Sequence, residues 1–184
     1  MMDAHSSYYA RVKKRISWIH RQLYYFRLSY DFEDVLFTGH SMGGTEASMA
    51  PVMFTDTMHL KFYKKFGVKL KLHTITFAQT RPGGSKFAKL ARARTNFHRR
   101  IENCADPATV LPLNALGYQH IDDAVLIYPK NSGFELVQYD ISKRYGGLGI
   151  GFEYLCTIRS GLEAFFFQQT YVQTILKIYM KFIY

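Results

Sequence analysis

The stretch Val35-Leu-Phe-Thr-Gly-His-Ser41-Met-Gly-Gly44 decides the fold that we expect for this chain. Three apolar residues precede Gly39-His-Ser-Met-Gly43, and Thr45 to Met53 has the composition of a helix. A Gly-x-Ser-x-Gly sequence between a strand and a helix is typical of a nucleophile elbow, a sharp turn that holds a serine hydroxyl away from the sheet. Ser41 is therefore the candidate nucleophile, and an ordinary strand–helix turn is the alternative.

The neighbours of Ser41 suit this role. Gly39 and Gly43 lack a Cβ atom, so we expect neighbouring backbone to pass close to the turn. The backbone N–H of Met42, at the start of the helix, is the predicted oxyanion donor, because it faces the negative charge that develops when the serine attacks a carbonyl. His40 is expected to point to the opposite side from Ser41 and to pack or hydrogen-bond around the turn.

Three further segments follow in order: Thr74-Ile-Thr-Phe-Ala-Gln-Thr-Arg-Pro-Gly83, Arg100-Ile-Glu-Asn-Cys-Ala-Asp-Pro-Ala-Thr-Val-Leu-Pro112 and Gly117-Tyr-Gln-His120. With Gly39-His-Ser-Met-Gly-Gly44, this set resembles the class 3 (fungal-type) lipases of the α/β-hydrolase superfamily. The resemblance covers about Phe32 to Tyr128, roughly half of the chain. It departs from the family pattern where Arg81 precedes Pro82 in reversed order and where Pro107 follows Asp106.

The resemblance implies an α/β fold: an incomplete α/β-hydrolase with a mostly parallel sheet flanked by helices. It also implies a serine ester hydrolase that acts on acylglycerols or related lipid esters, without a metal or organic cofactor. The catalytic residues of this fold follow in the order serine, acid, histidine. Asp106 matches the catalytic aspartate of the family, and the alternative role for Asp106 is a loop cap ahead of Pro107.

The base of this triad is harder to assign. Of the seven histidines, only His120 follows Asp106, but it matches a histidine with a structural or accessory role in the family. The catalytic histidine of the family lies further on, where this chain reads Glu163-Ala-Phe-Phe-Phe-Gln-Gln-Thr-Tyr171. A glutamine amide cannot accept the serine proton at neutral pH.

Three interpretations therefore stay open. His120 serves as the base, or the tail derives from a different exon or a shifted frame and leaves an impaired lipase. The third is a non-catalytic lipase-fold protein that binds a membrane surface or a partner. A complete lipase of this family is longer, and only 34 residues precede Val35. We expect the second oxyanion donor and the lid to be missing, and one sheet edge to be exposed.

Chain length and charge indicate the domain organisation and the kinds of partner to expect. The 184 residues suit a single lipase-like domain over 1–184, with a divergent and helical tail over 143–184. The net charge is +10, and Lys61 to Arg100 holds 12 lysines and arginines without an acidic residue. This basic region is either a solvated face or a surface that attracts anionic membranes. No nucleic-acid motif accompanies the basic region, so nucleic acid is not an expected partner.

The ends and the cysteines give weaker indications. The first residues lack the pattern of a signal peptide, which leaves the localisation open. Leu162 to Tyr184 is amphipathic but lacks an apolar run that could span a bilayer, so we expect it to dock on the sheet or to lie at a membrane interface. Cys104 and Cys156 allow one disulfide, and free thiols are the expected state.

Periodicity and turn residues predict the order of the elements. Helices are expected over 8–30, 42–55 and 85–95, with Pro51 kinking or ending the second and Ser85 capping the third. Residues 58–66 are expected to form a helix or a loop. Strands are expected over 35–38, 69–77, 97–103 and 124–128. This alternation predicts a mainly parallel sheet with helices on both faces.

Overall fold

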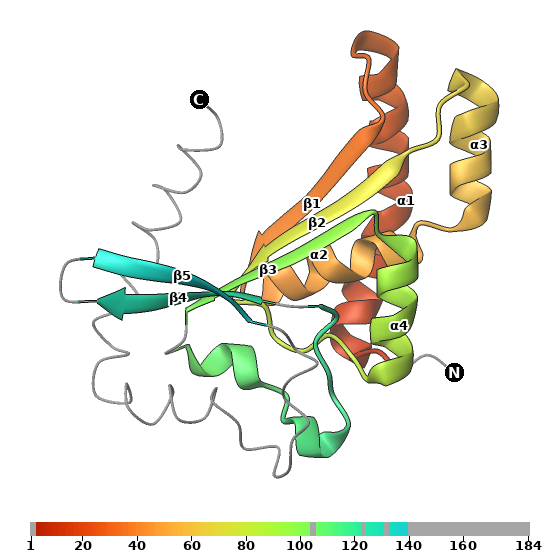
Figure 1. The fold of residues 1–184 in the computed structure, drawn as a ribbon. Coiled ribbons are helices and arrows are strands. Elements are labelled where there is room, and N and C mark those ends of the chain that lie inside the picture. Colours follow the sequence, from red (N-terminus) through yellow and green to blue (C-terminus); the bar gives the residue numbers. More distant parts are fainter. Residues whose placement is uncertain (1–2, 104–105, 123, 131–132, 140–184) are drawn as a thin grey trace.

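A computed structural model describes residues 3–103, 106–122, 124–130 and 133–139 of the chain. Its five strands form one sheet in the order β1-β2-β3-β4-β5 (Figure 1). Strands β1 to β4 run parallel, and β5 runs antiparallel to β4. The mostly parallel sheet that the sequence predicts is thus confirmed. The strands are β1 Asp34–His40, β2 Lys71–Phe77, β3 Phe97–Asn103, β4 Ala124–Lys130 and β5 Gly133–Tyr139.

Four α-helices flank one face of the sheet in the part of the chain that the structure describes (Figure 1). Strands in sequential order place their connections on the same face, because crossovers between parallel strands are right-handed. The prediction of helices on both faces is therefore not met within the described residues. The helices are α1 Ser6–Ser29, α2 Met42–Met53, α3 Asp56–Phe66 and α4 Ser85–Arg94, and the 3₁₀ turns are η1 Pro107–Val110 and η2 Asn114–Leu116.

The main core lies between the sheet and these helices. Alternate residues of a strand point to opposite faces. Leu72 on the helix side of β2 is buried, whereas Leu36 on the other side of β1 is 53% exposed. Removing apolar surface from water stabilises the fold by about 25 cal/mol per Å². The core includes Val12, Ile16, Met49, Met53, Phe62, Leu72, Phe87 and Ala91.

The position of Pro51 in α2 and the N-terminal cap of α4 are two details that the sequence did not fully predict. Pro51 is buried inside α2, which continues to Met53. Ser85 is the first residue of α4 rather than its cap. The side chain of Asp3 takes over the capping, since its carboxylate accepts from the N–H of Phe87 at 2.7 Å and of Lys86 at 3.3 Å.

Strand β5 was not predicted, although its sequence carries the signal of a hairpin. Turn-favouring Asn131-Ser132-Gly133 follows the apolar β4, and Phe134 to Tyr139 then mixes apolar and polar residues. The predicted tail, with Cys156 and Leu162 to Tyr184, lies outside the described residues, as does Cys104. Within the described residues, no helix combines the length and apolar character needed to cross a membrane.

Candidate active site

The backbone of Ser41 has the geometry of a nucleophile elbow. Ser41 joins the end of β1 to the start of α2 with φ 54° and ψ −122°. These angles match the first central position of a type II′ turn, which glycine adopts readily. A serine held there costs of order 1–3 kcal/mol of backbone strain, and such strain concentrates at functional sites. The expected strand–turn–helix context is thus confirmed.

Two glycines make this sharp turn sterically feasible. A Cβ atom on Gly39 would lie 2.4 Å from the carbonyl oxygen of Gly43, and one on Gly44 would lie 2.9 Å from that of Gly39. A Cβ atom on Gly43 would meet nothing within 4 Å. The expected close approach of backbone is therefore confirmed at Gly39 and wrong at Gly43, and Gly44 is the second glycine that the turn requires.

The turn that follows β2 supports the elbow from its neighbour strand. The N–H of Ser41 donates to the carbonyl oxygen of Phe77 at 2.8 Å. The hydroxyl of the buried Thr45 in α2 hydrogen-bonds the hydroxyl of Thr80 at 2.7 Å. Met42 is the first residue of α2. Its N–H therefore has no acceptor within the helix, which leaves it suited to the predicted oxyanion role.

Arg81 extends this support to the loop after β3. Its buried guanidinium donates to the carbonyl oxygens of Val110 and, at 2.9 Å, of Pro112, while its backbone N–H donates to that of Leu111 at 2.7 Å. The reversed Arg81-Pro82 order therefore places a cation that ties the turn after β2 to the segment that follows η1. The elbow and the loop of Asp106 are connected through this turn.

Asp106 caps the 3₁₀ turn η1. Its carboxylate accepts from the N–H of Ala108 at 2.9 Å. Burial raises the pKa of Asp106, against smaller lowering effects from the Ala108 hydrogen bond and from the charge of His40. The loop-cap role is thus confirmed, and it uses one carboxylate oxygen. The other oxygen makes no hydrogen bond within residues 3–103, 106–122, 124–130 and 133–139, so the cap does not exclude a catalytic role.

His40 lies closer to the acid candidate than sequence reasoning anticipated. The residue is exposed at the end of β1, on the sheet face that carries Leu36. Its charge reaches Asp106 strongly enough to lower the pKa of that carboxyl. His40 ends β1 and Asp106 follows β3, which is separated from β1 only by β2. The carboxyl ends of parallel strands share one edge of the sheet, and this is the signal that would have placed the two residues near each other.

His120 is held beneath the same loop. It is 1% exposed, and its Nε2 donates to the carbonyl oxygen of Thr109 in η1 at 2.8 Å. Since a carbonyl only accepts, Nε2 carries the proton, and Nδ1 is the atom that could accept one. Among the described residues, no hydrogen bond joins Ser41 to His120 or to Asp106. The structure brings Asp106 and His120 to one loop, and their catalytic roles stay predictions.

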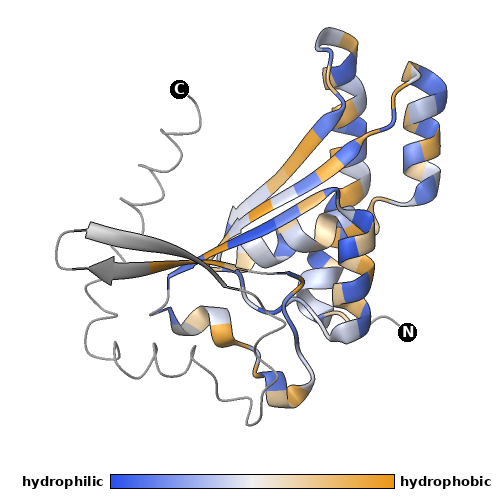
Figure 2. Ribbon diagram, in the orientation of Figure 1, coloured by the Kyte–Doolittle hydropathy of each residue, from blue (hydrophilic) through white to orange (hydrophobic). Residues whose placement is uncertain are grey.

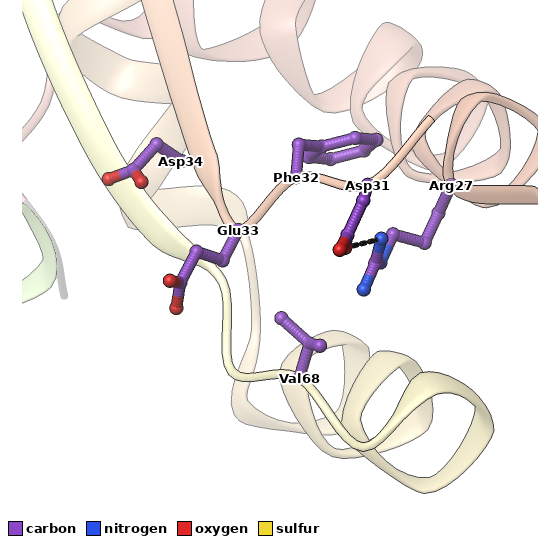
Figure 3. Close-up of a pocket in the computed structure, with 6 residues that line it drawn as sticks. All are labelled: Arg27, Asp31, Phe32, Glu33, Asp34 and Val68. Atoms are coloured by element: carbon purple, nitrogen blue, oxygen red, sulfur yellow. Dashed lines mark hydrogen bonds and ion pairs between the residues drawn. The ribbon is translucent and has the colours of Figure 1, made fainter. Parts of the chain in front are cut away.

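A cavity of about 590 Å³ lies at the opposite end of β1 from Ser41 (Figure 3). Three carboxylates line it, and each has a basic partner: Asp31 pairs with Arg27, Glu33 with Lys71 at 3.2 Å, and Asp34 with His73 at 2.6 Å. These ion pairs join α1, β1 and β2. We assign these pairs a structural role, because each carboxylate already has a partner and the cluster lies at the opposite end of β1 from the elbow.

Comparison with solved structures shows the same fold in lipases. A triacylglycerol lipase whose catalytic centre is a serine protease triad aligns with a TM-score of 0.61 and 21% identity, over 80% of this chain and 54% of that one. A mutant form of MDLA from Penicillium cyclopium aligns at 0.57 and 23% identity, over 80% and 53%. The propeptide complex of Rhizomucor miehei lipase aligns at 0.55 and 26% identity, over 76% and 42%. This chain thus spans about half the length of the lipases that it matches.

The sequence comparisons identify the family directly. No match is found among curated proteins. The family model described as lipase (class 3) matches residues 2–116, which is more than half of the chain and includes α1, the elbow and the loop of Asp106. The chain belongs to the class 3 lipase family.

Proposed function

We propose that this chain hydrolyses acylglycerols or related lipid esters, with Ser41 as the nucleophile and Asp106 as the acid. Family membership and fold support a lipase-type function. The observation that carries the proposal is the backbone of Ser41, whose φ of 54° and ψ of −122° appear between β1 and α2 within Gly39-His-Ser-Met-Gly-Gly44. A strained, non-glycine residue at this turn is what a nucleophile elbow requires.

In this proposal, the hydroxyl oxygen of Ser41 attacks the ester carbonyl while its proton passes to a histidine. The N–H of Met42 stabilises the oxyanion; the intermediate then collapses, the histidine gives its proton to the departing alcohol, and an acyl-enzyme remains. Water then attacks the acyl carbonyl and passes a proton to the histidine, which returns it to Ser41 as the fatty acid leaves. His120 is the proposed base and would accept the proton at Nδ1. The Nε2–H of His120 now donates to the carbonyl oxygen of Thr109. In a catalytic triad, this N–H would donate to the carboxylate of Asp106 instead.

Turnover of a short-chain triacylglycerol tests this function. We expect the wild-type chain to release fatty acid and Ser41→Ala to release none. Ser85→Ala is the matched control, because Ser85 is an exposed serine at the start of α4 and is not part of the elbow sequence. Retained hydrolysis in Ser41→Ala, or no hydrolysis by the folded wild-type chain, contradicts the proposal.

The base is tested separately with His120→Gln. The amide nitrogen of glutamine matches the position of Nε2 and can still donate to Thr109, but glutamine cannot take up a proton. If His120 is the base, His120→Gln abolishes hydrolysis while the melting temperature stays close to wild type. If hydrolysis survives, His120 positions the loop through Thr109 and another group takes the proton.

A second candidate function is non-catalytic binding to an anionic membrane surface. The 12 basic residues of the Lys61–Arg100 region favour it, since Lys61, Lys64, Lys65, Lys69, Lys71, Lys86 and Lys89 are exposed. This function predicts binding to anionic vesicles that weakens as salt is added and is unchanged by Ser41→Ala. Absence of vesicle binding at low salt removes this candidate.

A further inference from the structure

A cavity of about 380 Å³ is lined by residues from the end of α4 and the start of β3. These two elements follow each other in the chain and meet at one corner of the fold (Figure 1). Strand β4 starts level with Arg100, so the first three residues of β3 have no strand partner on that side within the described residues. The cavity occupies this corner and involves no residue of the proposed lipase chemistry. It is lined by Arg92, Thr95, Asn96, Phe97, His98, Arg99 and Asp122.

The lining of the cavity is predominantly basic. Arg92 comes from the last turn of α4, and its Nε donates to the carbonyl oxygen of Ile121, which fixes the side chain at the cavity. Arg99 comes from β3, and its guanidinium carbon lies 5.4 Å from the ring centroid of Phe97. The carboxylate of Asp122 and the partial negative charge at the end of α4 oppose these cations, and two full guanidinium charges outweigh them.

His98 gives the second, independent sign of a ligand. The residue is 6% exposed, and neither ring nitrogen has a hydrogen-bond partner in the part of the chain that the structure describes. Burial, with the charges of Arg100, Arg92 and Arg99, lowers the pKa of His98 to about 3. The ring is therefore neutral at pH 7, with one N–H to donate. Buried polar groups in folded proteins are nearly always hydrogen-bonded, so this side chain is suited to a bound group.

We infer that this cavity binds a phosphate group. Arginine is the preferred side chain for phosphate, because its planar guanidinium can donate two parallel hydrogen bonds to phosphate oxygens. Arg92 reaches the cavity from α4 on the helix side of the sheet, and Arg99 reaches it from the opposite face of β3, because neighbouring residues of a strand point to opposite faces. His98 and Asn96 line the same cavity. Asn96 also keeps its carbonyl oxygen on the N–H of Leu72 at 3.0 Å, so its amide nitrogen is left for a ligand.

This site is separate from the proposed esterase site. In the sheet register, Phe97 is level with His73 and Leu36, and Ser41 lies five residues further along β1. At about 3.3 Å per residue, the two sites are about 16 Å apart along the strand direction. Phosphate binding therefore goes beyond the proposed esterase function and does not depend on Ser41. The phosphate could belong to a small soluble compound or to a phospholipid headgroup, because both present the same oxyanion.

Titration of the full-length chain with inorganic phosphate tests the inference. Calorimetry measures the affinity, and the ring resonances of His98 in an NMR spectrum report the location. The double variant Arg92→Gln with Arg99→Gln removes both guanidinium groups. The matched control Lys86→Gln with Lys89→Gln removes the same charge from exposed positions of α4 that do not line the cavity.

We expect saturable binding that shifts the His98 resonances in the wild-type chain and in the control. In the arginine variant, the affinity should fall at least about tenfold, since charge-assisted hydrogen bonds are lost. Absence of saturable binding to the wild-type chain overturns the inference, as does an equal loss of affinity in the control. A melting temperature close to wild type shows that the arginine variant is folded.

Vesicles of phosphatidylcholine with and without phosphatidic acid distinguish the two sources of the phosphate. If a headgroup is the ligand, phosphatidic acid vesicles bind the control better than the arginine variant and displace inorganic phosphate from His98. If a soluble phosphate compound is the ligand, these vesicles leave the His98 resonances unchanged while inorganic phosphate shifts them.

Discussion

The absence of a side chain on Gly39 permits the strained conformation of Ser41, because the backbone is crowded there. The turn brings the carbonyl of Gly43 against Gly39, so a side chain at position 39 has no room. Position 43, only four residues on, is open. Sequence reasoning could identify the elbow from the glycines and the serine, but it could not rank the glycines, since their spacing does not reveal which backbone atoms meet.

A pair of substitutions tests this account of the elbow. Gly39→Ala should destabilise the chain by about 2–3 kcal/mol, because its Cβ would collide with backbone that cannot move freely. Gly43→Ala is the control. It should leave the free energy of unfolding unchanged or raise it by up to about 1 kcal/mol, because alanine favours a helix more than glycine does. Urea unfolding measures both values. Equal destabilisation by the two substitutions contradicts this geometry.

Asp106 shows a conflict between stability and function. Its pKa is raised by burial, so the folded chain holds the proton more tightly than the unfolded chain, whose carboxyl has its ordinary pKa of 3.8. The charged carboxylate therefore destabilises the fold. This destabilisation is absent below pH 3.8, grows as the pH rises towards the folded-state pKa, and is complete above it.

Substitution of Asp106 by asparagine should therefore stabilise the chain at neutral pH. Asparagine can still accept from Ala108, and it carries no charge to bury. The difference in melting temperature from wild type should vanish below about pH 4. If Asp106 is the catalytic acid, this more stable variant also loses ester hydrolysis. A variant that is less stable than wild type at neutral pH contradicts the assigned cause of the pKa shift.

Among the secondary-structure elements, strand β3 is the most polar of the strands (Figure 2). Arg100 and Glu102 both point beneath the helices, form an ion pair and are 0% and 1% exposed. Arg100 also donates from Nε to the carbonyl oxygen of Asp122 at 2.8 Å, which ties β3 to the segment before β4. The sequence predicted a strand over 97–103, but not that its charged residues would be the buried ones.

Removal of one partner of this pair should be costly. Glu102→Gln removes the carboxylate that pairs with the buried charge of Arg100 and should destabilise the chain by about 3–5 kcal/mol. The neighbouring Arg99→Gln should change stability by no more than about 1 kcal/mol, because it loses only the contact with Phe97. Thermal or urea unfolding compares the two. A small effect of Glu102→Gln shows that the pair does not hold β3 in place.

Element boundaries illustrate what the sequence could predict. Apolar periodicity gave α1, α2, α3 and α4 and the parallel strands to within a few residues, because those patterns are local. The cap of α4 comes from Asp3, more than 80 residues away, and no local pattern reveals such a contact. The antiparallel β5 has a local signal in the turn residues after β4, but a hairpin departs from the alternation of strands and helices that precedes it.

At the scale of the whole molecule, the described chain forms a one-sided layer structure. Helices α1 to α4 cover one face of the sheet, and β1 forms one edge of it within the described residues. The elbow, the turn after β2 and the loop of Asp106 meet where the parallel strands end, which is where α/β folds place their active sites. The order of the motifs predicted this arrangement. The hydrogen bond from His120 to Thr109 could not be predicted, because it forms only when the loop of Asp106 is folded.

Labelling with a fluorophosphonate probe tests the central claim, an activated Ser41, most directly. The probe modifies an activated serine whatever the natural substrate, and mass spectrometry identifies the modified residue. We predict that the wild-type chain and Ser85→Ala are labelled at Ser41, and that Ser41→Ala is not labelled. A folded wild-type chain that remains unlabelled, or one that is labelled at another serine, contradicts the claim.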